Sequence, residues 1–241
     1  MKWNGVMPAI TTCFTEKYEV DHAFLADHAR WLIENGCTGI VALGSLGEGA
    51  TLHPAEKLAI LKTFTKALKG KAPLVASISA LSTPEAVELA KSAEGAGCDG
   101  LMILPPYVYK GDWREMKAYV ATVLRATSLS CMLYNNPVAY GTDFLPEQIA
   151  ELAKEHANLA AVKESSTDVR RVTAIRALLG ERLAVFGMRC RGPSRRAIDL
   201  RRAFAGQVSR QPAHRLYAIR HQPRAGLPAG IAAECDRQAG T

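Results

Sequence analysis

The amino-acid sequence predicts an α/β fold built on a parallel β-sheet. Through the first 186 residues, short apolar runs alternate with longer stretches whose apolar residues recur at helical spacing. The repeat is about 25–35 residues long, which is the length of one strand with its crossover helix. Such a repeat fits either a (β/α)8 barrel or an open, doubly wound sheet, and both folds place functional residues at the carboxyl ends of the strands.

Seven apolar runs are predicted to form strands, because each is short and bounded by polar or turn-forming residues. The runs are 6–12, 38–43, 73–78, 100–104, 130–134, 159–163 and 182–186. The carboxyl ends of parallel strands lie at one edge of a sheet, so functional residues are expected in the loops that begin at Gly44, Leu104, Tyr134 and Lys163.

Six helices are predicted between these runs from their start and stop signals. Asp21 caps the first helix, which stops before Gly36, and Pro54 opens the second, which ends before Gly70. Ser82 and the Thr83-Pro84 pair begin the third. Apolar residues keep helical spacing in three further stretches, which lie within 113–124, after Pro146 over 149–153, and over 169–179.

The positive charge of the chain is concentrated at its C-terminal end. The formal net charge is +7, but residues 187–241 contain eleven Arg, no Lys and three acidic residues, which gives 11 − 3 = +8. Residues 1–186 therefore carry 7 − 8 = −1. We expect a body of seven strands over 1–186 and an atypical Arg-rich tail over 187–241 in place of the last strand–helix units.

Two interpretations of the tail remain open. A basic arm for nucleic acid is one, but the segment has few aromatic residues for base stacking and no recognised nucleic-acid motif, so a nucleic-acid partner is not expected. The preferred interpretation is out-of-frame sequence from a GC-rich gene that replaces the end of the domain. Resequencing the locus tests it, because an intact downstream frame should restore barrel-like sequence.

Several classes of protein are disfavoured by the sequence. No apolar run reaches 18 residues, and the N-terminus lacks the basic-then-apolar layout of a secretory signal, so neither a membrane span nor secretion is expected. The six cysteines are far apart and show no zinc-like spacing with histidines, so we expect no metal site. Buried, reduced thiols favour a cytoplasmic location.

The segment GSLGEGATL, residues 44–52, follows a predicted strand. Gly44 and Gly47 flank Ser45 and Leu46 and permit a tight turn whose backbone N–H groups can hold a carboxylate or a phosphate. It is neither a dinucleotide-binding fingerprint nor a P-loop. An ordinary strand-to-helix turn is the alternative for this segment alone.

Lys163 and Tyr134 each stand at the end of a predicted strand. In a barrel mouth Lys163 would lose water, its pKa would fall, and the neutral amine could attack a carbonyl carbon. The Tyr134 hydroxyl could carry protons beside the reacting carbon. Taken singly, Lys163 is as well explained as a solvated side chain and Tyr134 as a rim residue. Because both are expected at the same edge of the sheet as the glycine turn, the three together favour a catalytic site.

With these residues in place, the sequence resembles the dihydrodipicolinate synthase/N-acetylneuraminate lyase family of class I aldolases. The shared motifs are GSLGE at 44–48, LPPYVY at 104–109, YNNP at 134–137 and VKESS at 162–166. The resemblance implies a (β/α)8 barrel, here truncated or altered after the seventh strand, that is usually tetrameric and needs no metal or organic cofactor. It implies that Lys163 forms a Schiff base with a small 2-oxo acid, that Tyr134 transfers protons, and that Ser45 with the turn of Gly44, Leu46 and Gly47 holds the substrate carboxylate.

Three departures from the family pattern bear on the substrate. Leu46 replaces a second Ser or Thr of the glycine turn, Val108 replaces a relay tyrosine, and Ala139 replaces an arginine that grips the carboxylate of a second substrate. These changes make lysine biosynthesis doubtful, because a methyl group cannot imitate a bidentate guanidinium.

GSLGE together with YNNPVAYG resembles the branch that deaminates Δ1-pyrroline-4-hydroxy-2-carboxylate in hydroxyproline degradation. The alternatives are 4-hydroxy-tetrahydrodipicolinate synthase or another pyruvate aldolase, and an inactive truncated remnant. Because residues 187–241 do not resemble the units that close the barrel, we expect the chain as written to be poorly folded or inactive.

Overall fold

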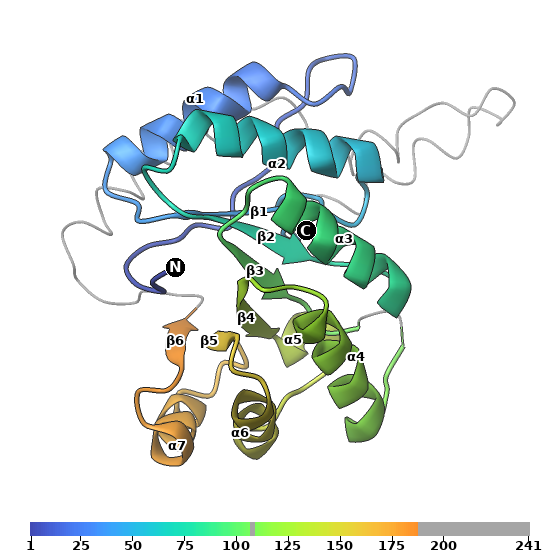
Figure 1. Ribbon diagram of the computed structural model, residues 1–241, viewed down its shortest axis with the longest axis vertical. Coiled ribbons are helices and arrows are strands. Elements are labelled where there is room, and N and C mark those ends of the chain that lie inside the picture. The colour runs from blue at the N-terminus through green and yellow to red at the C-terminus, as the bar shows by residue number, and fades with distance from the viewer. Residues whose placement is uncertain (107–108, 188–241) are drawn as a thin grey trace, which may run out of the picture.

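A computed structural model describes residues 1–106 and 109–187 (Figure 1). Within this part of the chain, consecutive strands pair in parallel and form one sheet in the order β1-β2-β3-β4-β5-β6. The strands are β1 (Ile40–Ala42), β2 (Leu74–Ile78), β3 (Gly100–Ile103), β4 (Ser130–Asn135), β5 (Leu159–Glu164) and β6 (Ala184–Gly187). The open, doubly wound alternative is wrong, because its strand order must reverse, whereas this sheet curls in one direction with the helices outside it (Figure 1).

In the part of the chain that the structure describes, the six predicted helices are all present, together with a seventh that was not predicted. The helices are α1 (His22–Glu34), α2 (Pro54–Leu68), α3 (Thr83–Gly95), α4 (Trp113–Arg125), α5 (Pro137–Tyr140), α6 (Pro146–Glu155) and α7 (Arg170–Leu179). The predicted caps form: Asp21 accepts a hydrogen bond from the backbone N–H of Phe24, and Ser82 accepts one from Glu85. The unpredicted helix is α5, a single turn between β4 and α6.

The first apolar run, residues 6–12, is not a regular strand, and the prediction of seven strands is wrong in this respect. The run makes one parallel bridge, Ala9 to Val41, with hydrogen bonds from Ile10 N–H to Val41 and from Val41 N–H to Pro8. Pro8 has no N–H group, so it cannot donate to a continuing ladder. The remaining six runs form strands as predicted.

Apolar side chains form two layers, one on each face of the sheet. The outer layer packs between strands and helices and contains Leu101, Ile103, Leu133 and Val162. The inner layer lies on the concave face and consists of Val41, Val75, Met102, Leu104, Met132, Tyr134 and Ala161. Successive strand residues point to opposite faces, so this alternation directs Tyr134 and Lys163 to the concave side.

The N-terminal segment connects the two edges of the sheet. Ala9 bridges to β1, while the ring of Trp3 packs edge-on against Phe186 of β6 with centroids 6.2 Å apart. The Trp3 indole Nε1 also donates to Ser130 Oγ at the start of β4, at 2.7 Å. Trp3, Met7 and Ala9 all pack on the inner apolar layer, so this segment lies on the concave side.

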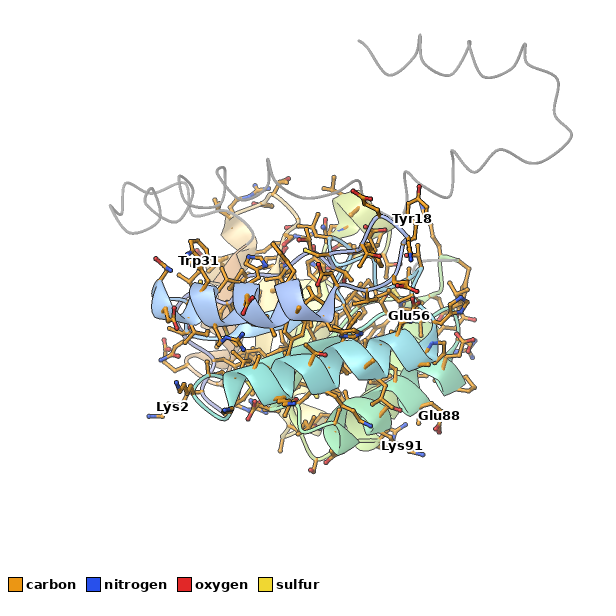
Figure 2. All side chains as sticks on the ribbon, turned by 90° about the horizontal axis from the view of Figure 1, so that it is seen from above. Lys2, Tyr18, Trp31, Glu56, Glu88 and Lys91 are labelled. Carbon is orange, nitrogen blue, oxygen red and sulfur yellow. The ribbon has the colours of Figure 1, made fainter. Side chains whose placement is uncertain are left out.

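The outer helices present charged side chains such as Glu88 and Lys91 of α3 (Figure 2). Within the described residues, no helix is both long enough and apolar enough to cross a membrane. Cys13, Cys37, Cys98 and Cys131 are buried, free thiols, and burial raises the pKa of Cys98 and of Cys131 to about 12. The predicted Arg-rich tail and Val108 lie outside the described residues.

Candidate active site

Lys163 lies one residue before the end of β5, opposite Tyr134 in the register with β4. Its Nζ lies 4.1 Å from the centroid of the Tyr134 ring. Burial lowers the pKa of Lys163 below its ordinary value of 10.5. The cation–π contact with the ring favours the ammonium form and so opposes this shift.

Tyr134 is fixed on three sides. Its ring is buried, with Lys163 over one face and the ring of Tyr140 edge-on at a centroid distance of 5.7 Å. The Asn136 side chain donates a hydrogen bond from Nδ2 to the Tyr134 hydroxyl at 2.9 Å. Because the phenol oxygen accepts this bond, its own proton is left to point elsewhere.

Asn136 also determines the local backbone. Its Oδ1 accepts from the N–H of Ala139 at 3.2 Å and so caps α5, while Pro137 occupies the first helical position. Gly141 ends the turn with a left-handed φ of 68°. One amide side chain therefore positions both the Tyr134 hydroxyl and the short helix that carries Tyr140.

The glycine turn after β1 exposes Ser45 and Leu46 and buries Gly44 and Gly47. The Thr12 hydroxyl donates to the Gly47 carbonyl at 2.6 Å, and a Cβ on Gly47 would lie 2.8 Å from the Ile10 carbonyl oxygen. Within residues 1–106 and 109–187, the N–H groups of Ser45, Leu46 and Gly47 donate to no acceptor. The turn is thus packed on its carbonyl side and has free donors for an anion.

We expect Gly49→Ala to lower the free energy of unfolding by about 3 kcal/mol, because overpacking next to backbone cannot relax cheaply. A Cβ at Gly49 would lie 2.0 Å from the Leu43 carbonyl oxygen. Gly95→Ala in α3 is the matched control: a Cβ there meets nothing within 4 Å, and we expect a gain of about 0.5–1 kcal/mol. Urea unfolding measures both, and equal effects would contradict the clash.

Tyr140 connects the turn to the lysine–tyrosine pair. Its hydroxyl hydrogen-bonds to Ser45 Oγ, and its ring packs against Tyr134, which in turn lies under Lys163. The structure thus brings Lys163, Tyr134 and Ser45 together through a residue that the sequence analysis did not select. Asn136 was also missed, although an Asn-Pro pair followed by Gly141 is a recognisable signal for a capped turn.

The Glu164 side chain supports the backbone at the end of β5. Glu164 accepts from Asn135 Nδ2 at 3.0 Å and from the N–H of Ser166 at 2.7 Å, behind the strand ends. Asn135 also donates to Asp143, whose carboxylate makes a bidentate pair with Arg171 at 2.5 and 2.7 Å. This polar network ties β4, β5 and α7 together, next to the residues that face the concave side.

We expect Arg171→Ala to cost about 1–2 kcal/mol of stability at pH 7, a bidentate pair discounted for partial exposure. Arg171 lowers the pKa of Asp143 below its ordinary 3.8, so the native state binds that proton less tightly than the unfolded state. The stabilisation is therefore complete above about pH 4 and is lost as the pH falls further. Urea unfolding at pH 7 and pH 3 tests this, with the exposed Arg170→Ala as the near-neutral control.

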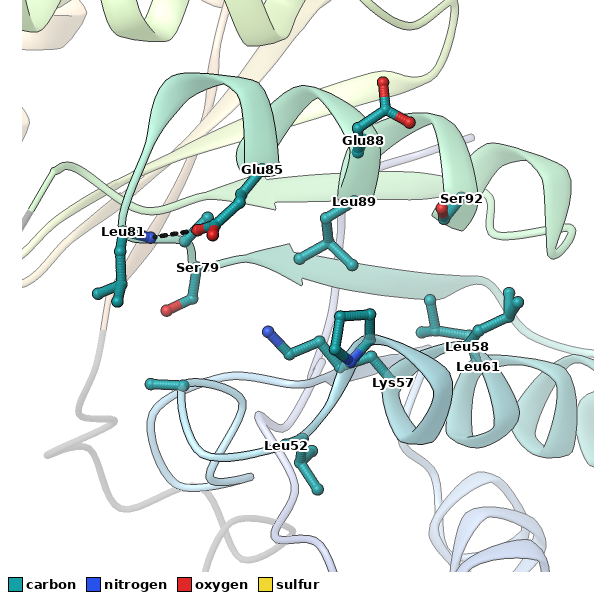
Figure 3. A pocket seen from close by; sticks show the side chains of 13 residues that line it. Leu52, Lys57, Leu58, Leu61, Ser79, Leu81, Glu85, Glu88, Leu89 and Ser92 are labelled. Atoms are coloured by element: carbon teal, nitrogen blue, oxygen red, sulfur yellow. Dashed lines mark hydrogen bonds between the residues drawn. The ribbon is translucent and has the colours of Figure 1, made fainter.

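A cavity within the described residues lies away from this site. A space of about 300 Å³ between α2 and α3 is lined by Leu52, Lys57, Leu58, Ser79 and Glu85 among others (Figure 3). It shares no lining residue with the set of Lys163, Tyr134 and Ser45. Within the described residues, no group of three or more His, Cys, Asp or Glu side chains could hold a metal ion.

The chain is similar to several known proteins. It is 34% identical over 181 residues to a 4-hydroxy-tetrahydrodipicolinate synthase of Desulforamulus reducens, covering 75% of this chain and 61% of the relative. It is also 34% identical over 183 residues to a "Probable 5-dehydro-4-deoxyglucarate dehydratase" of Pseudarthrobacter chlorophenolicus, covering 76% and 59%. The chain thus spans about three fifths of the length of these relatives.

Solved structures of the same family are also similar to this chain. A prophage protein of the dihydrodipicolinic acid synthase family from E. coli K12, in complex with pyruvate, superposes with a TM-score of 0.73 at 26% identity. The match covers 76% of this chain and 62% of that one. The family model for the dihydrodipicolinate synthetase family matches residues 2–188. On these grounds, the chain belongs to the dihydrodipicolinate synthetase family.

Proposed function

We propose that this chain carries the site of a Schiff-base lyase that acts on a small 2-oxo or cyclic 2-imino acid. The observation that supports it best is the Lys163 amine, which burial makes less basic and which lies 4.1 Å over the ring of Tyr134. A neutral amine attacks a carbonyl or imine carbon, whereas an ammonium does not. Loss of the proton also ends the cation–π attraction and frees the amine to move toward the substrate.

The remaining groups divide the work of the reaction. Tyr134 gives and takes protons at the reacting carbon, because Asn136 occupies its oxygen as a donor and leaves the phenol proton directed away from Asn136. Ser45 and the N–H groups of Leu46 and Gly47 hold the substrate carboxylate beside the lysine. No metal or organic cofactor is required, since the imine itself acts as the electron sink.

The specific substrate that we propose is Δ1-pyrroline-4-hydroxy-2-carboxylate, which has one carboxylate. This choice rests on Ala139, an exposed residue of α5 where the resemblance leads one to expect an arginine. Lys163 adds to C2 of the cyclic imine and the ring C–N bond breaks, which opens the ring by transimination. Loss of the 4-hydroxyl as water, followed by migration of the double bond, turns the freed C5 amine into a second imine. Hydrolysis of this imine and of the Lys163 Schiff base releases ammonia and 2,5-dioxopentanoate, and the whole sequence consumes one water in net.

Ammonia release tests this substrate. Incubation of the intact-frame protein with Δ1-pyrroline-4-hydroxy-2-carboxylate should release one ammonia per 2,5-dioxopentanoate formed, and absence of ammonia would rule the substrate out. The alternative is 4-hydroxy-tetrahydrodipicolinate synthase or another pyruvate aldolase, which the names of the relatives favour. That alternative predicts consumption of pyruvate together with an aldehyde and no ammonia.

An inactive remnant is the second candidate. β6 is the last strand of the described sheet, and its four residues are half-buried or exposed, which leaves an edge that a complete (β/α)8 barrel would cover. A cooperative thermal melt and a borohydride-stable pyruvate adduct on the 241-residue polypeptide would refute this candidate. The candidate would be supported if this chain showed neither the melt nor the adduct, while the protein made from a gene with an intact downstream frame showed both.

A further inference from the structure

The hydroxyl groups of Tyr140 and Ser45 form a pair that bridges two loops at the carboxyl edge of the sheet. Ser45 belongs to the turn after β1, and Tyr140 ends α5 after β4, 95 positions further along the chain. The Tyr140 ring is held edge-on by Tyr134 at an interplanar angle of 84°. The Tyr140 hydroxyl is therefore placed by a rigid neighbour rather than by a freely rotating side chain.

The protons of this pair can be assigned by their chemistry. Each hydroxyl has a single proton to donate, and only one proton lies between the two oxygens. The phenol is the more acidic partner, with an ordinary pKa of about 10, and is therefore the better donor. When Tyr140 donates to Ser45 Oγ, the Ser45 hydroxyl proton points away from Tyr140 and can be donated to another acceptor.

That proton belongs to a residue of the glycine turn. Ser45 is exposed, and the N–H groups of Ser45, Leu46 and Gly47 donate to no acceptor within the described part of the chain. A serine proton turned away from Tyr140 adds a donor to this set. A turn with these N–H groups and a serine proton suits an anionic carboxylate, which accepts charge-assisted bonds, better than a neutral ester or amide.

We propose that Tyr140 is a positioning residue that sets the Ser45 proton toward the substrate carboxylate and so makes the site selective for free 2-oxo acids. This inference rests on the proposed function, because the same turn supplies the carboxylate contact. Tyr140 acts through Ser45 and touches no reacting atom. Its removal should therefore weaken binding of the acid and spare the chemistry at Lys163.

The test measures non-covalent binding of pyruvate and of methyl pyruvate to the full chain in a Lys163→Ala background, which removes covalent capture. Tyr140→Phe keeps the ring against Tyr134 and removes only the hydroxyl. We expect the preference for pyruvate over its ester to fall about fivefold to tenfold, the value of one lost hydrogen bond. Ser45→Ala should give the same loss, and Tyr140→Phe should add nothing to it.

Tyr18→Phe is the matched control, since it deletes a hydroxyl from an exposed tyrosine and should leave the preference unchanged. Equal weakening of acid and ester by Tyr140→Phe, additive losses in the double variant, or no pyruvate binding at all would overturn the inference. If pyruvate binding and its loss follow expectation but borohydride traps nothing on the chain that retains Lys163, the proposed function fails and the role of Tyr140 stands.

Discussion

Lys163→Arg is expected to abolish the borohydride-stable adduct with pyruvate and to lower turnover by at least about 10⁴-fold, as for other covalent nucleophiles. Arginine keeps a cation over the Tyr134 ring but remains protonated at any accessible pH, so it cannot attack a carbonyl carbon. Mass spectrometry of the reduced protein gives the readout. An adduct of unchanged yield on the variant would place the nucleophile elsewhere.

Lys57 provides a matched control for this experiment. It is a second lysine whose pKa burial lowers, and it lines the cavity between α2 and α3 (Figure 3) rather than the candidate site. Lys57→Arg should leave the adduct intact. In the unaltered chain, the rate of adduct formation should rise with pH through a midpoint below 10.5, since the neutral amine is the reactive form and burial favours it.

Tyr134→Phe is expected to leave formation of the pyruvate adduct on Lys163 intact while slowing catalytic turnover. Phenylalanine preserves the aromatic face under the ammonium, so Lys163 keeps its position and the pyruvate adduct still forms. Turnover of the cyclic imine should fall about 10²–10³-fold, because a positioned acid–base group contributes a factor of that order. Steady-state kinetics should show the loss in kcat with little change in KM.

The control for Tyr134→Phe addresses stability, because the variant leaves Asn136 Nδ2 without its acceptor. Urea unfolding should show a loss of about 1–2 kcal/mol for this buried donor, and activity is then compared at a temperature where both proteins are folded. Unchanged kcat in a folded variant would remove the proton-transfer role. Loss of the adduct itself would show that Tyr134 supports Lys163 rather than the later steps.

The strand–helix order was predictable because it depends on local patterns. The six long helices could be predicted from capping residues such as Asp21 and Ser82 and from apolar spacing sustained over several turns. The first run failed as a strand because a single residue, Pro8, interrupts the ladder of donors. Hydrophobic patterns describe which face is buried and say little about which N–H groups are available.

The three residues that the sequence selected for the site are brought together by two that it did not. A four-residue helix is too short to show a period of 3.6, so the sequence predicted neither α5 nor a role for its Tyr140. The contact between Tyr140 and Ser45 joins residues 95 positions apart. No local pattern specifies such a pair, because it depends on how the sheet curls.

The position of Trp3 has a consequence for the order of synthesis. Besides the inner apolar layer, it contacts Ser130 and Phe186, residues that emerge from the ribosome long after it does. A contact between such distant positions must offset a large loop-closure entropy, and it forms late for that reason. Until β6 has been made, the nascent chain therefore lacks the edge-on contact between Trp3 and Phe186, and this is the species that a chaperone would meet.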